Sequence, residues 1–158
     1  MEMIYKAARL EKQAAGALEL ALINEQTLRE LTEDDVFTFR LTACDNQVDR
    51  EGERFTEATL EQLGKLYIGK PVLRDHNWSA ETQTARVYDA HLESKGEVKR
   101  LVLSCYMVRT ASTADTIAAI EGGILRECSV GCAVEHVNCS ICGADQRKTL
   151  CEHWPGRE

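Results

Sequence analysis

The sequence predicts an α+β fold in which mostly antiparallel strands form the core and a few helices flank it. Two observations support this prediction: apolar and polar residues alternate over several separate segments, and helix-capping signals lie between them. With 158 residues, 44% of them apolar, the chain suffices for one domain and a small appended module. We divide it into an N-terminal helical arm (1–35), a core (36–137), and a Cys/His loop with the C-terminal end (138–158).

The first half of the chain is expected to contain helix, strand and helix in that order. Residues 7–31 are rich in Ala, Leu, Glu and Gln, and their leucines follow a helical period loosely, which predicts one or two helical pieces. Alternation over residues 36–43 predicts a strand. Thr56 is a suitable N-cap for a helix that ends at Gly69-Lys70-Pro71. The apolar side of this helix is expected to contain Leu60, Leu63 and Leu66.

A short strand and a hairpin are predicted next. Residues 72–73 begin a strand that delivers His76 to its end or to the following loop. Residues 84–92 and 98–108 alternate again, and Gly96 between them is the expected turn of a hairpin.

The last predicted strand covers residues 124–137 and displays Ser129. It follows a helix that is capped at residues 112–113 and ends near Gly122. Because side chains alternate along a strand, Ser129 faces away from an apolar set that we interpret as core: Cys128, Val130, Cys132 and Val134. Gly131 leaves room for a substrate carbonyl beside Ser129. An ordinary outward-facing serine next to a bulge at the glycine fits the same pattern.

Ser129 and His76 are the candidate catalytic residues. A serine hydroxyl is a poor nucleophile until an imidazole takes its proton, so this pair suits acyl transfer. The alternative for His76 is a solvated loop residue beside Asp75. The cysteines of the serine strand are excluded as nucleophiles because buried thiols are inert. The residue that orients the imidazole is unassigned, with Asp89 and His91 left open.

Four separated segments between about Phe37 and about Gly131 form an ordered pattern. They are the acidic turn 45–53, the helix opening Phe55-Thr56, the segment Gly69-Lys70-Pro71-Val72-Leu73-Arg74-Asp75-His76, and the run Gly123-Ile124-Leu125-Arg126-Glu127-Cys128-Ser129-Val130-Gly131. In these segments the chain resembles the tailed-bacteriophage prohead proteases, capsid-maturation serine peptidases whose fold is related to that of the herpesvirus assemblins.

The resemblance implies a barrel-like protease core over residues 36–137, with His76 as the base and Ser129 as the nucleophile. It implies endoproteolysis of phage scaffold and major capsid proteins, and of the protease itself, within the immature capsid in the host bacterial cytoplasm. Homo-oligomerisation stays open. Residues 1–35 are then expected to be a propeptide or a scaffold-binding arm.

Family members carry further strands after the serine strand, and one of these supplies another catalytic residue. This sequence stops at Glu158, which is the pattern of a truncated or processed product. The alternative function is therefore a catalytically inactive or truncated capsid-assembly protein that keeps the protease fold.

Potential metal ligands gather near the end of the sequence: Cys139, Cys142, Cys151 and His153. The Cys-x-x-Cys-Gly run predicts a tight knuckle, and Gly143 permits the positive φ that such a knuckle uses. Four thiolate and imidazole ligands match a closed tetrahedral zinc site, which leaves no position for water and is structural. The alternative is a loop of reduced thiols with a surface histidine.

Composition narrows the remaining function classes. The net charge of -7 argues against binding of nucleic acid through its phosphates. No run approaches the ~20 apolar residues that span a bilayer, and the N-terminus lacks the features of a secretion signal, so we expect no membrane partner and a cytoplasmic location. Seven cysteines, an odd number, favour metal binding over disulfides in that compartment.

Overall fold

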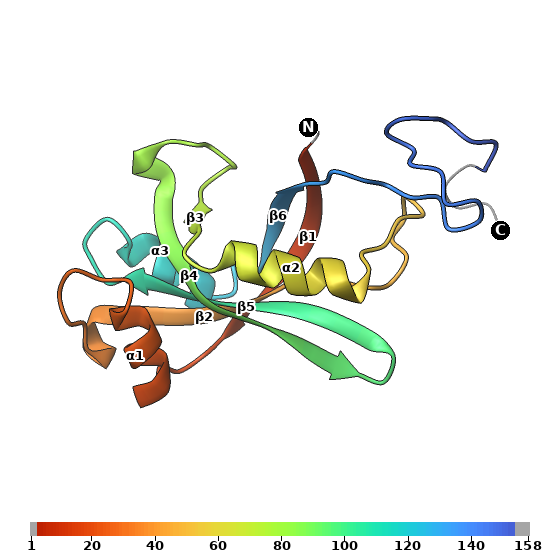
Figure 1. Cartoon of the computed structure of the whole chain (residues 1–158). Helices are drawn as coiled ribbons and strands as arrows, with labels where there is room; N and C mark the ends of the chain where they lie inside the picture. Colours follow the sequence, from red (N-terminus) through yellow and green to blue (C-terminus); the bar gives the residue numbers. More distant parts are fainter. Residues whose placement is uncertain (1–2, 154–158) are drawn as a thin grey trace.

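A computed structural model describes residues 3–153 and has the predicted α+β fold (Figure 1). The strands in these residues are β1 (Met3–Lys12), β2 (Val36–Asp45), β3 (Pro71–Leu73), β4 (Gln83–Lys95), β5 (Val98–Val108) and β6 (Glu127–Ala133). The α-helices are α1 (Ala17–Asn24), α2 (Glu57–Tyr67) and α3 (Ala114–Glu121), and short 3-10 helices cover Glu33–Asp35 and Ala80–Thr82.

The six strands form one antiparallel sheet that is curled into a half-barrel. Their order is β3-β4-β5-β2-β1-β6, so β3 and β6 are the two outermost strands. The β4–β5 hairpin forms as predicted, with Gly96 in its turn at φ +62°. Because the sheet is curled, both outermost strands lie on the same side of α2 in Figure 1.

Residues 3–12 were expected to belong to a helical arm, but they form β1 inside the sheet. β1 pairs with β2 on one side and with β6 on the other. Ala8 and Leu10 contribute to the main core, and packing between two strands outweighs the helix propensity of this Ala-rich stretch. The prediction of a helical arm is therefore wrong here, and α1 is the helical piece of residues 1–35.

The main core lies between the sheet and α2. Thr56 caps α2 as predicted, because its hydroxyl accepts a hydrogen bond from the Thr59 amide at 3.2 Å. Leu60 and Leu63 are buried against the sheet, with contributions from α3 at one end of the core. Leu66, which the sequence places on the same side of the helix, is 56% exposed, so the buried part of that side ends before it.

A second, smaller core lies where α1 covers the opposite face of the sheet. It consists of Ile23, Leu31, Val36, Tyr88 and Tyr106. The two cores lie on opposite faces of the sheet because side chains alternate along each strand. Val36 of β2 packs into the smaller core, whereas the next residue, Phe37, packs into the main core. The sheet is thus apolar on both faces over part of its area.

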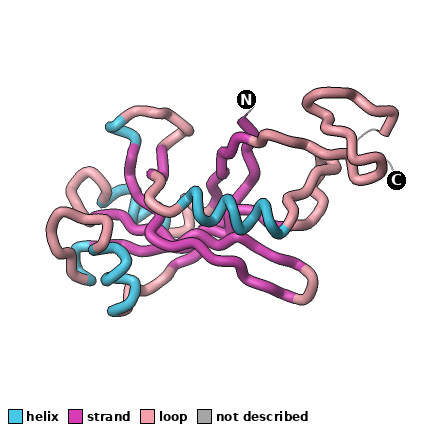
Figure 2. The backbone as a smooth tube through the Cα atoms, in the orientation of Figure 1, coloured by secondary structure: helices cyan, strands magenta, loops and turns pink. Residues whose placement is uncertain are grey.

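β6 is shorter than the predicted strand over residues 124–137. The turn after α3 uses the first residues of that range, since the amides of Ile124 and Leu125 both donate to the carbonyl of Ala119. Gly123 has a φ of +72°, which allows this turn. Beyond β6 the described chain is irregular (Figure 2), except for an isolated bridge between Asn138 and Asp145.

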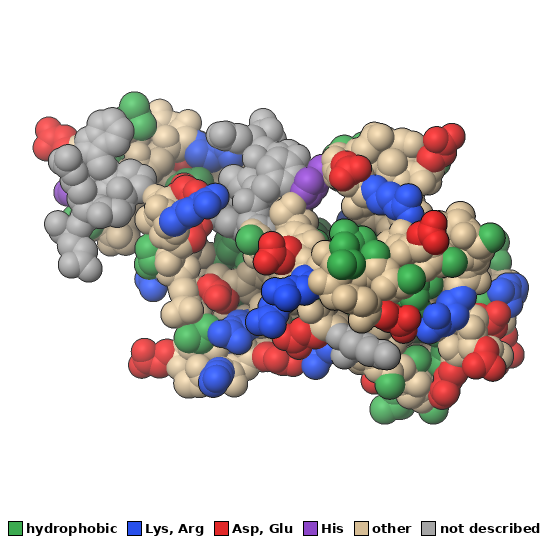
Figure 3. Space-filling model, turned by 180° about the vertical axis from the view of Figure 1, so that it is seen from behind, with side chains coloured by type: hydrophobic (Ala, Val, Ile, Leu, Met, Phe, Trp, Pro, Cys, Tyr) green, Lys and Arg blue, Asp and Glu red, His purple; other side chains and the backbone are tan. Residues whose placement is uncertain are grey.

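The surface carries mixed charge. On the face drawn in Figure 3, Lys and Arg side chains are interspersed with Asp and Glu side chains. Over residues 3–153 none of the helices has the length and apolar character needed to cross a membrane.

Candidate functional site

His76 and Ser129 meet in the folded chain. The Nε2 atom of His76 lies within hydrogen-bonding distance of the Ser129 Oγ, and both residues are exposed. The prediction that these two side chains come together is confirmed, whereas their catalytic role stays a prediction.

Ser129 projects from the outermost strand β6. Val130 and Cys132, which lie on the alternate positions of the strand, turn into the main core, so Ser129 points to the other side, as the alternation of the sequence predicts. Across the ladder Ser129 is opposite Ala7 of β1. The serine is therefore fixed on regular backbone, and its hydroxyl is open to solvent.

His76 lies in the loop that follows β3, and the backbone there is strained. Asp75 and His76 have φ values of 53° and 52°, a left-handed conformation that non-glycine residues rarely adopt. Two local hydrogen bonds hold the loop: the Asn77 amide donates to the Arg74 carbonyl at 3.0 Å, and the Thr82 hydroxyl donates to the Asn77 carbonyl at 2.5 Å. Such strain persists where the surroundings fix it, and it is common at functional sites.

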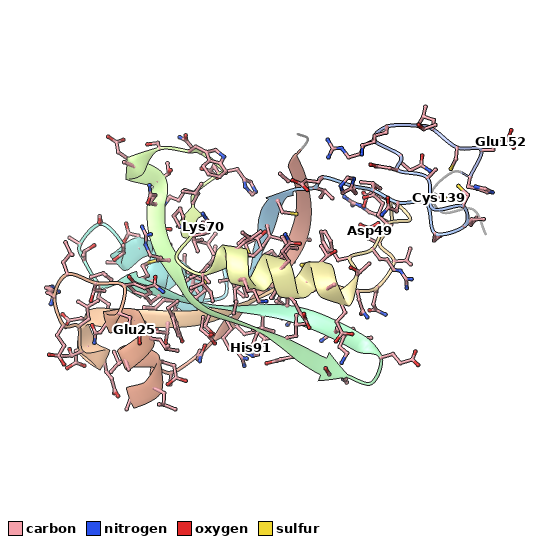
Figure 4. All side chains as sticks on the ribbon, viewed as in Figure 1. Glu25, Asp49, Lys70, His91, Cys139 and Glu152 are labelled. Carbon is pink, nitrogen blue, oxygen red and sulfur yellow. The ribbon has the colours of Figure 1, made fainter. Side chains whose placement is uncertain are left out.

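Asp89 and His91, which the sequence left open as orienting residues, belong to a charged group of their own. The Nδ1 of His91 lies 3.6 Å from Asp89, and its Nε2 lies 3.3 Å from Glu93 and 2.9 Å from the Arg40 guanidinium. Figure 4 shows His91 below α2, whereas Lys70, which immediately precedes β3, lies above it. The residue that orients His76 stays unassigned.

Two cysteines of the sheet, Cys128 and Cys105, are poor nucleophiles, as the sequence predicts for Cys128. Burial raises the pKa of Cys128 to about 11 and raises that of Cys105 further. Both thiols are therefore protonated at neutral pH. Ser129 with its imidazole partner is the better candidate nucleophile on this strand.

The four predicted metal ligands also come together. The ligand atoms of Cys139, Cys142, Cys151 and His153 all lie within 4.8 Å of one another, so the cluster could hold a metal ion. Tetrahedral zinc bonds of ~2.3 Å would place sulfur atoms about 3.8 Å apart, which lies within this limit. Figure 4 shows Cys139 and Glu152 in the outlying loop beyond β6, with sulfur atoms gathered near Cys139.

The knuckle around Cys139 favours the thiolate that a metal requires. Gly143, at φ +75°, donates its amide to the Cys139 carbonyl at 2.9 Å, as the Cys-x-x-Cys-Gly run predicts. The amides of Cys142 and Ile141 donate to the Cys139 sulfur and lower its pKa to about 6. The Ala144 amide acts to lower the pKa of Cys142, but contact with Cys139 and burial raise it more.

Sequence reasoning missed the residues that organise this loop. His136 donates from Nδ1 to the Asp145 carboxylate at 2.8 Å and lowers the pKa of Asp145 to about 2, while the Arg147 and Val137 amides donate to the same carboxylate. The Gln146 amide side chain donates to the Cys151 sulfur at 2.8 Å. An aspartate two residues after the knuckle glycine was the available signal, since Asp side chains often accept from nearby amides.

Comparison with known proteins gave no assignment. No model of a protein family matches the chain, and neither a curated protein nor a solved structure was found to be similar to it.

Proposed function

We propose that this protein is a serine endopeptidase in which Ser129 is the nucleophile and His76 is the general base. The observation that carries the proposal is the contact between His76 Nε2 and Ser129 Oγ, because it joins two side chains that are remote in the sequence. The exposure of Ser129 and the strained backbone at His76 support it further.

The chemistry follows from this contact. In the tautomer with the proton on Nδ1, His76 Nε2 accepts the Ser129 proton while Oγ attacks the carbonyl carbon of a peptide bond. The imidazolium then returns the proton to the leaving amine as the C–N bond breaks. Water attacks the resulting ester with His76 again as base, which releases the acid and restores Ser129.

For substrates we propose the scaffold and major capsid proteins of a phage or prophage, with cleavage of the protease itself, inside an immature capsid. The ordered resemblance of residues 37–131 to prohead proteases supports this part of the proposal. The half-barrel sheet is compatible with the barrel-like core that the resemblance implies.

We further propose that the Cys/His cluster binds structural zinc. Four such ligands would complete a tetrahedral zinc site without a place for water, and amide donors to sulfur are suited to metal-bound thiolate. A zinc ion would fix residues 139–153 beyond the serine strand, and no chemical step is assigned to it.

A fluorophosphonate probe tests the peptidase proposal. Ser129 should displace the fluoride and become covalently labelled. Ser129→Ala should abolish labelling, and His76→Ala should reduce it to a small residual rate. Ser112→Ala, which changes an exposed loop serine, is the matched control and should label like the wild type. A folded wild type that is not labelled would favour the inactive capsid-assembly protein instead.

A further inference from the structure

The proposed catalytic pair joins the two outermost strands of the sheet. His76 follows β3 and Ser129 lies on β6, and in the described sheet these strands are separated by all the others. No ladder of backbone hydrogen bonds therefore sets the distance between the two residues in this part of the chain. Because a catalytic pair has to be held within about 0.5 Å of its productive geometry, other contacts must supply the alignment.

One side-chain hydrogen bond connects the two edges close to Ser129. Tyr67, the last residue of α2, donates from its hydroxyl to the carbonyl of Gly131 at 3.1 Å. Tyr67 is joined to the start of β3, because the Lys70 amide donates to its carbonyl at 2.9 Å. Burial raises the pKa of Tyr67, so the hydroxyl stays protonated and remains a donor.

A second bond starts close to His76. The Arg74 guanidinium donates from Nη2 to the Thr116 hydroxyl of α3 at 2.5 Å. The next residue of α3, Ile117, is buried in the main core, so Thr116 is a fixed partner. The end of α3 leads through a short turn into β6 and Ser129.

We propose that Tyr67 and Arg74 are positioning residues that hold the His76 imidazole against Ser129. This proposal rests on the proposed function. Each residue connects the β3 edge to the segment that carries the serine. Tyr67 binds this segment beyond Ser129, at Gly131, and Arg74 binds it before Ser129, at Thr116. Loss of either bond lets the two edges shift relative to each other, and a displacement of ~1 Å can cost about 100-fold in rate.

Tyr67→Phe and Thr116→Val test the proposal, because each removes one polar atom and keeps the side-chain shape. We expect each to slow fluorophosphonate labelling about tenfold and the double variant about 100-fold. In a His76→Ala background the same substitutions should change the residual rate little, since the aligned imidazole is then absent. Tyr106→Phe, on the opposite face of the sheet, is the matched control and should keep the wild-type rate.

A merely structural role gives a different result. If labelling slows only in proportion to the unfolded fraction, or slows equally in the His76→Ala background, Tyr67 and Arg74 do not position the pair. Arg74→Lys, which keeps a donor, should recover part of the rate that Arg74→Ala loses. Equal rates for Lys and Ala at this position would contradict the role of Arg74.

If the wild-type protein is not labelled, the peptidase proposal fails. The alignment of His76 with Ser129 is then tested directly by NMR. The NMR resonances of the His76 ring should change on Ser129→Ala in the otherwise unaltered chain. They should change much less in the Tyr67→Phe/Thr116→Val variant. An equal change in both backgrounds would show that the two hydrogen bonds do not hold the pair together.

Discussion

The His76–Ser129 pair and the Cys/His cluster are assembled in opposite ways. The pair joins two outermost strands that are distant in the sequence, and it exists only because the sheet curls. The four residues of the cluster lie within one loop, between positions 139 and 153, and their own turns bring them together. The comparison shows that a local site depends on spacing and turn residues, whereas a non-local site depends on the whole sheet.

The largest expected effect tests the proposed zinc site by removing one of its ligands. Cys142→Ala should lower bound zinc from about one per chain to none, because structural zinc contributes about 10 kcal/mol or more through a complete ligand set. Elemental analysis of protein purified under reducing conditions without chelator measures this, with Cys44→Ala as the control outside the cluster. Labelling of Ser129 should persist in Cys142→Ala, and its loss would show that the two sites are coupled.

The second prediction concerns a substitution that destabilises the sheet and leaves the Cys/His loop unchanged. Leu103 is 2% exposed in the main core, so Leu103→Ala should lower the free energy of unfolding by about 2–5 kcal/mol. In a urea titration, Ser129 labelling should disappear at lower urea than in the wild type. Zinc should be retained to higher urea than labelling is. Simultaneous loss of both would contradict the independence of the cluster.

A third prediction uses the pH dependence of the thiols in metal-free protein. The amides of Cys142 and Ile141 lower the pKa of Cys139 to about 6, whereas burial raises the pKa of Cys128 to about 11. A thiol reacts as its thiolate, which predominates above its pKa, so iodoacetamide at pH 7 should modify Cys139 first. The rate should fall as the pH drops through about 6, whereas Cys128 should react only after unfolding. Peptide mass spectrometry resolves the two sites, and similar rates would contradict the prediction.

The smallest effect concerns the cap of α2, the helix that ends in Tyr67. Thr56→Ala removes the acceptor for the Thr59 amide and should cost about 1 kcal/mol of unfolding free energy. Thermal denaturation should show a lower midpoint, and zinc content should be unchanged. An unchanged or higher midpoint would mean that the cap hydrogen bond does not contribute to stability.

Local signals predicted much of the fold. The alternation along β2, the cap at Thr56 and the glycine turn of the β4–β5 hairpin each act over a few residues, and all three predictions are confirmed. β1 was missed because its pairing partners lie about 30 and 120 residues away, where propensity carries no information. The exposure of Leu66 was not predictable, because periodicity gives a face of the helix and not the length over which that face is buried.

The two sites differ in the same way. The spacing of Cys139, Cys142, Cys151 and His153 was sufficient to predict that they gather. The prediction that His76 meets Ser129 required two separate segments of the sequence and a resemblance of several segments to a known family. Tyr67 and Arg74 gave no signal, because a hydroxyl or guanidinium that bridges two edges of a sheet has no characteristic neighbours in the chain.

The left-handed backbone at Asp75 and His76 bears on protein engineering. Selection for heat resistance should recover glycine or asparagine at position 75, because these residues tolerate this conformation best. The same relief is unavailable at position 76 without discarding the imidazole. A substitution at position 76 that raises thermal stability would then remove the reactivity of the imidazole. Variants selected for heat resistance should therefore also be assayed for Ser129 labelling.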